Sequence, residues 1–137
     1  PQLGSVSVTH LVSIHQVGRV IHPGALEGQV EGGAAMGLGY ALMEEMKVKA
    51  NGAWTDNFME YILPSMDDMP EITPVLLEDP DPQGPFGAVG AGESVTVATA
   101  PAILNAVRDA TGHQFLQIPL APEALIRELD RRGTARP

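Results

Sequence analysis

The stretch from residue 25 to residue 48 combines a helical pattern of apolar residues with an unusual load of glycine. Apolar side chains recur there at four-residue steps, the spacing that gathers side chains on one face of an α-helix: Leu26, Val30, Ala34, Leu38 and Leu42. The same stretch holds five interior glycines: Gly28, Gly32, Gly33, Gly37 and Gly39. An interior glycine costs a helix about 0.8–1 kcal/mol relative to alanine.

This cost indicates that another body approaches the backbone of the helix closely. Two explanations are open at this stage. The helix packs tightly on a sheet or on a second helix, or the glycines clear room for a bulky cofactor. In both cases we expect the apolar face of the helix to be buried.

The remaining patterns predict an α+β fold, in which a mixed β-sheet is packed by the long glycine-rich helix and two shorter helices. Strands are expected in four segments: residues 5–14, 17–22, 71–78 and 115–120. The strand at 71–78 contains Pro74, which indicates either a strand at the edge of a sheet or one that starts late. Shorter helices are expected near residues 98–110, with Gly112 as the stop, and from Pro122 onward.

The chain has 137 residues, enough for one domain with a core of its own. We expect residues 1–130 to form this single domain and residues 131–137 to be a frayed tail. The chain begins with Pro1, which is consistent with a fragment or a processed product. No basic and then apolar segment opens it, so a cytoplasmic location is expected, and a periplasmic one stays open.

The charge balance excludes several classes of partner. Seventeen acidic residues against eight basic ones give a net charge of −9, which disfavours nucleic acid and anionic membrane surfaces. No apolar run approaches the roughly 20 residues of a membrane-spanning helix. The chain has no cysteine, so it forms no disulfide and offers no thiolate to zinc or to an iron–sulfur cluster.

The histidines and the paired aspartates do not predict a metal site. The four histidines lack the close spacing of ligands on one helix, and no carboxylate pattern completes a set: His10, His15, His22 and His113. Asp67 and Asp68 are adjacent, so their side chains point in different directions. We interpret them as part of a solvated turn, and we expect no metal to be bound by this chain's own side chains.

The segment GPFGAVGAGES, residues 84–94, raises the question of a phosphate-binding loop. Gly87, Gly92 and Ser94 stand where such a loop has its glycines and hydroxyl, but Glu93 occupies the position of the lysine. At ~4 Å and an effective dielectric constant near 20, a charge pair is worth about 4 kcal/mol, so the exchange turns attraction of phosphate into repulsion. The loop is therefore expected either to present a catalytic carboxylate or to cap the following helix.

Two segments taken together resemble one known family. They are VGRVIHPGALEGQVEGGAAMGLGYALMEE at 17–45 and the glycine loop GPFGAVGAGES at 84–94. Both resemble the C-terminal part of the molybdenum-cofactor subunit of the xanthine dehydrogenase and aldehyde oxidoreductase family. The resemblance covers roughly residues 5–126, and the pairing of the two glycine motifs is more specific than either motif alone.

The resemblance implies an enzyme component that hydroxylates aldehydes or nitrogen heterocycles with oxygen derived from water. By analogy with the family, Glu93 would be the general base, and Gln29 would lie against the pterin of a molybdopterin-type molybdenum cofactor. Other residues implied to bind the cofactor are Gly33, Gly90, Ala91 and Gly92. Four positions depart from the pattern of many relatives: Gln16, His22, Met36 and Val89.

The resemblance also implies partners, because in the family this segment is only the last part of a longer subunit. The expected partners are the remainder of the molybdenum subunit and separate iron–sulfur and flavin subunits. The chain alone is not expected to bind the cofactor or to be active. Surface left uncovered would then favour self-association. The alternative is a non-catalytic truncated relative, or a binding module, that keeps the fold.

Overall fold

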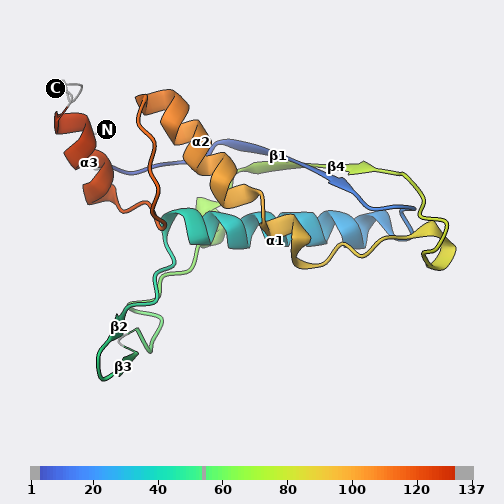
Figure 1. The fold of residues 1–137 in the computed structure, drawn as a ribbon, viewed down its shortest axis with the longest axis horizontal. Helices are drawn as coiled ribbons and strands as arrows, with labels where there is room; N and C mark the ends of the chain where they lie inside the picture. The colour runs from blue at the N-terminus through green and yellow to red at the C-terminus, as the bar shows by residue number, and fades with distance from the viewer. Residues whose placement is uncertain (1–3, 54, 132–137) are drawn as a thin grey trace.

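The computed structural model describes residues 4–53 and 55–131 and confirms the α+β class. Figure 1 shows the long helix α1 along the centre, with the strands β1 and β4 beside it and α2 crossing it. The larger elements are β1 (His10–Gln16), α1 (Pro23–Leu42), β4 (Glu71–Leu77), α2 (Thr99–Thr111) and α3 (Pro122–Arg131). The short ones are β2 (Val48–Lys49), β3 (Gly52–Ala53) and the 3-10 turns η1 (Met66–Asp68), η2 (Pro85–Gly87) and η3 (Glu93–Thr96).

The strands are divided between two small sheets, one parallel and one antiparallel, where the sequence predicted a single mixed sheet. β1 pairs in parallel with β4, in a register that runs from His10 opposite Glu71 to Gln16 opposite Leu77. Residues 17–22 do not form the strand that the sequence predicted, and only Gly18 makes an isolated bridge, to Ala88. Two parallel strands such as β1 and β4 need a long crossover between them. Here α1 and the β2–β3 hairpin, which projects from the body in Figure 1, supply that crossover.

Residues 115–120 do not form the short strand that the sequence predicted. Their last residue instead joins the helical layer, where Leu120 N donates to Ala41 O at 2.7 Å. Leu120 is buried there with Val107 and Leu125, so this segment docks α3 onto α2. The predicted tail at 131–137 lies outside the described residues except for Arg131, the last residue of α3.

Helix α1 spans Pro23–Leu42, six residues short of the predicted end at residue 48. It ends because Met43 N and Glu44 N both donate to Gly39 O, which closes the last turn. The predicted apolar face is confirmed, since Val30, Ala34 and Leu38 are buried and the two outer leucines are half-buried. Leu38 and Ala41 pack against Ala100 and Ile103 of α2 to form one of the two core clusters.

α2 ends as the sequence predicted, with Gly112 in the left-handed conformation at φ 69°. Among the residues that the structure describes, no helix combines the length and apolar character needed to cross a membrane.

His22 begins α1 as its N-cap. Its Nδ1 accepts a hydrogen bond from Ala25 N at 3.0 Å, and Pro23 follows as the first helical residue. We predict that His22→Ala lowers the free energy of unfolding by about 1 kcal/mol, because one N–H at the start of α1 loses its partner. His22→Asn should keep the parent stability, since an asparagine side chain caps equally well. Urea unfolding of the three proteins measures this, and equal stability of the alanine and asparagine variants would contradict it.

Candidate functional site

The glycine loop at residues 84–92 is tied at its first half to the connection between β1 and α1. Val89 N donates to Val17 O at 3.1 Å, and Arg19 N donates to Gly87 O at 2.8 Å. Gly18 lies between these bonds at φ 63°, and a Cβ there would meet Gly87 O and lie 2.8 Å from Val89 N. Only glycine therefore allows the two backbones to approach this closely.

The second half of the loop leads into η3, which packs on the glycine-rich face of α1. A Cβ on Gly33 would collide with Val95 Cγ2 and lie 2.9 Å from Val95 Cβ. Val95 is only 1% exposed. A Cβ on Gly37 would collide with Thr99 in the same way. At these two positions the glycines are needed for tight packing within the chain, which was the first of the two explanations open from sequence.

Other glycines of α1 have no such role within the chain. A Cβ added to Gly28 or Gly32 would meet no atom within 4 Å among the described residues. Both residues are exposed, so their cost in helix stability is not explained by packing inside this chain.

Glu93 is the first residue of η3 and is exposed. No hydrogen bond or ion pair joins its carboxylate to any other described residue. The alternative that Glu93 caps a helix is therefore not supported, because neither η3 nor α2 has a side-chain cap at its start. Gly90 and Gly92 beside it are exposed, and a Cβ on either would meet nothing within 4 Å.

The remaining predicted site residues lie on α1 and in the glycine loop. Gln29 is exposed on α1, one helical turn before Gly33, and Gly33 lies under Val95 two residues after Glu93. Ala91 is half-buried in the loop. The space beside Gly33 is thus filled by the chain's own Val95, and Gly33 positions η3.

Two positions that depart from the pattern of many relatives have structural roles here. His22 caps α1, and Gln16 Nε2 donates to Asp79 O at 2.9 Å, which ties the end of β1 to the loop after β4. Nearby, Val20 N donates to Glu78 Oε2 at 3.0 Å. These bonds fix the same β1–α1 connection to which the glycine loop is attached.

Sequence reasoning missed Gly18 and Val95, the two residues that hold the loop. Gly18 stands alone in a strand-like stretch, and that isolated glycine was the available signal of a close backbone approach. Val95 carried no signal, because its partner Gly33 is distant in sequence.

Two acidic residues outside the loop, Asp68 and Glu44, have structural partners. Asp68 accepts hydrogen bonds from Ser65 N and Ser65 Oγ, both at 2.8 Å, which lower the pKa of its carboxyl. Tyr61 donates to Glu44 Oε2 at 2.6 Å, and this bond raises the pKa of the phenol. Asp67 and Asp68 thus belong to a capped turn, as predicted. No group of three or more potential metal ligands occurs among the described residues.

Comparisons with known proteins place these observations in a context. The sequence model of the molybdopterin cofactor-binding domain family matches residues 1–70. The chain is 40% identical over 116 residues to a probable xanthine dehydrogenase subunit of Bacillus subtilis, covering 85% of this chain and 16% of that protein. It is 35% identical over 133 residues to a putative xanthine dehydrogenase molybdenum-binding subunit of Escherichia coli, covering 96% of this chain and 18% of that protein.

Solved structures give the same picture. Quinoline 2-oxidoreductase from Pseudomonas putida matches with a TM-score of 0.81 and 32% identity, over 92% of this chain and 16% of that one. Reconstituted CO dehydrogenase from Oligotropha carboxidovorans matches with a TM-score of 0.87 and 27% identity, over 98% and 17%. The chain thus spans less than a fifth of the length of these relatives.

Proposed function

The chain belongs to the molybdopterin cofactor-binding domain family, and on that premise we propose that it is one component of a molybdenum hydroxylase in which Glu93 is the general base. The remainder of a molybdenum-binding subunit would complete the site, and iron–sulfur and flavin subunits would carry electrons away. Aldehydes and nitrogen heterocycles are the proposed substrates, with the oxygen taken from water. The relatives named as xanthine dehydrogenase subunits support this assignment.

The observation that carries the proposal is the state of the Glu93 carboxylate. It is exposed and unpaired among the described residues, yet the loop that bears it is held on both sides. On one side the backbone is bonded to the β1–α1 connection at Gly18, and on the other Val95 is packed against Gly33. A carboxylate without a structural partner on a well-supported loop is suited to chemistry with a bound molecule.

The residues present fit a bulky cofactor. Gly90 and Gly92 leave the loop backbone open beside Glu93, and Gly28 and Gly32 leave one stripe of α1 open. These glycines meet nothing among the described residues, so a neighbour outside them accounts for their presence. Gln29 lies in the same part of α1 and offers an amide that can both donate to and accept from a pterin ring.

When bound, the cofactor supplies the oxidation of the substrate. The chain's own contribution is a proton transfer, in which an oxygen of the Glu93 carboxylate accepts the proton that water loses as its oxygen passes to the substrate. A positioned general base of this kind contributes about 10²–10⁴ in rate. The alternative of a non-catalytic relative draws on the departures at Gln16, His22, Met36 and Val89. The structural roles of the first two residues weaken it.

An experiment on Gln29 tests the cofactor-binding part of the proposal. The tagged chain is purified with its natural partners, and molybdenum is measured per complex. We expect Gln29→Ala to lower the molybdenum content about tenfold, the lower end of what a supporting residue contributes to metal affinity. Gln114→Ala, an exposed glutamine in the α2–α3 connection, serves as the matched control and should leave the content unchanged. Equal molybdenum in the two variants would contradict the assignment of Gln29.

A further inference from the structure

The backbone of β1 has one paired edge and one open edge. Glu71 N donates to Thr9 O at 3.3 Å, and Val17 N donates to Leu77 O at 3.1 Å. In a parallel pair the backbone groups of alternate residues point to opposite edges. The odd-numbered residues of β1 therefore point to β4, and the even-numbered ones point away. Among the described residues, the outward backbone groups of Val12 and Ile14 have no partner.

The outer edge of β4 is protected and that of β1 is not. By the same alternation, the nitrogen of Pro74 points away from β1, and proline has no N–H to offer another strand. β1 contains no proline, and no charged side chain occurs anywhere in residues 1–18. Proteins protect free sheet edges with such residues, so an unprotected edge is one that is paired in the working protein.

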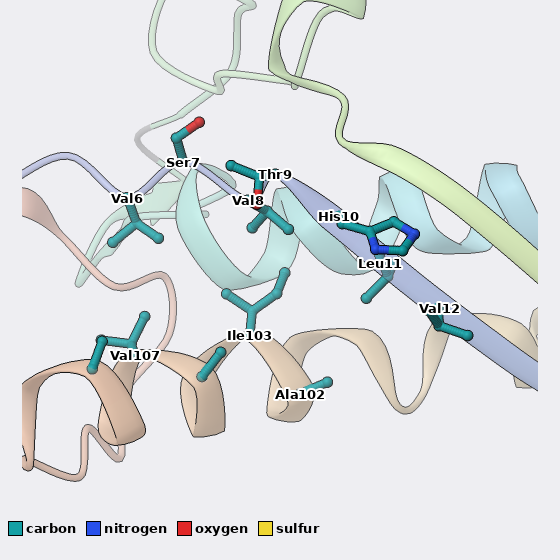
Figure 2. A pocket seen from close by; sticks show the side chains of 12 residues that line it. Val6, Ser7, Val8, Thr9, His10, Leu11, Val12, Ala102, Ile103 and Val107 are labelled. Carbon is teal, nitrogen blue, oxygen red and sulfur yellow. The ribbon is translucent and has the colours of Figure 1, made fainter.

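An apolar groove runs along this open edge. Figure 2 shows β4 on one side of β1 and α2 on the other, with Val8, Ile103 and Val107 side chains gathered between strand and helix. The groove has a volume of about 390 Å³ and is lined by residues 6–12 and one stripe of α2. That stripe presents small side chains at four-residue steps: Ala102, Ala106 and Ala110. Val12 and Ile14 beside it are 51% and 59% exposed.

We propose that a β-strand from outside this chain pairs with the open edge of β1 and fills the groove between β1 and α2. The occupant is an extended, uncharged segment with apolar side chains, because unpaired backbone groups select a strand and the alanine stripe accepts apolar contacts. It comes from the part of a molybdenum-binding subunit that these 137 residues do not match, since they span only 16–18% of the relatives' length. This inference rests on the assembly part of the proposed function.

Hydrogen exchange of the assembled complex tests the pairing residue by residue. The amides of Val12 and Ile14 should exchange at least tenfold more slowly in the complex than in the isolated chain. The amides of Ser13 and His15, which point to β4, should change little and act as the internal control. Fast exchange at Val12 and Ile14 within an assembled complex would overturn the inference and leave the proposed function intact. A chain that joins no molybdenum-binding subunit would overturn both.

Variants of Val12 make the test independent of exchange rates. Val12→Pro removes only an outward N–H, so the ladder to β4 should persist while recovery of the partner subunit falls at least tenfold. Val12→Thr keeps the N–H and the branched shape and should assemble like the parent. Val12→Lys keeps every backbone group and adds a charge in the groove, so it should also block assembly. It serves as the test if the proline variant does not fold. Normal assembly of Val12→Lys would overturn the proposal. It would also be overturned if the Val12 amide of the isolated chain became protected from exchange as concentration rises, because a second copy would then occupy the edge.

Discussion

Gly33→Ala is expected to destabilise the chain and to displace the glycine loop that bears Glu93, although alanine is the better helix former. The new Cβ would collide with Val95 Cγ2 and lie 3.1 Å from the backbone carbon of Val95, so both the side chain and η3 must move. Overpacking of this kind costs about 1–3 kcal/mol, which exceeds or offsets the roughly 1 kcal/mol gained in helix propensity. Because Glu93 is two residues from Val95, turnover in the assembled enzyme should fall about 100-fold through misplacement.

Gly32→Ala is the matched control on the neighbouring position. Its Cβ meets nothing among the described residues, so we expect the isolated chain to gain up to about 1 kcal/mol in free energy of unfolding. The double variant Gly33→Ala, Val95→Ala should recover part of the lost activity, because it removes the colliding methyl groups. Thermal unfolding of the isolated chains and turnover of the assembled enzymes measure these effects. Gly33→Ala at least as stable as Gly32→Ala would contradict the packing argument.

Local patterns in the sequence predicted the elements that local forces determine. The four-residue spacing of Val30, Ala34 and Leu38 found the buried face of α1, and Gly112 marked the end of α2. Pairing choices were missed, because they depend on segments far apart in the chain. β1 pairs with β4 although α1 lies between them in the sequence, and the residues of neither strand indicate which strand is its partner.

For the candidate site, too, local features were predicted from the sequence and long-range contacts were not. The glycine loop led to the prediction that Glu93 is presented as a carboxylate, and Glu93 is exposed in the structure. Its role as a base stays a prediction. The sequence could not divide the glycines of α1 by role. Only the fold shows that Gly33 and Gly37 admit Val95 and Thr99, while Gly28 and Gly32 face open space.

Glu93→Gln is expected to abolish most turnover of the assembled enzyme. The amide keeps the size and shape of the side chain but no longer accepts a proton. Loss of a general base contributing 10²–10⁴ in rate raises the barrier by about 3–5 kcal/mol. Molybdenum content should stay at the parent level, because the proposed contact of this residue is with the reacting proton and not with the pterin.

Stability of the same variant distinguishes chemistry from folding. Glu93 is exposed and has no hydrogen-bond partner among the described residues, so Glu93→Gln should leave thermal unfolding nearly unchanged. A residue that stabilised the chain as a helix cap would instead cost about 1 kcal/mol when replaced, with activity nearly intact. The two roles therefore predict opposite pairs of results.

Turnover per molybdenum atom, measured for the parent and for Glu93→Gln in the assembled enzyme, tests the account most directly. Normalising to bound molybdenum removes any effect of cofactor loss and isolates the proton transfer assigned to Glu93. A fall of about 100-fold or more at equal molybdenum is the predicted result. Turnover per molybdenum within threefold of the parent would contradict the assignment of Glu93 as the base.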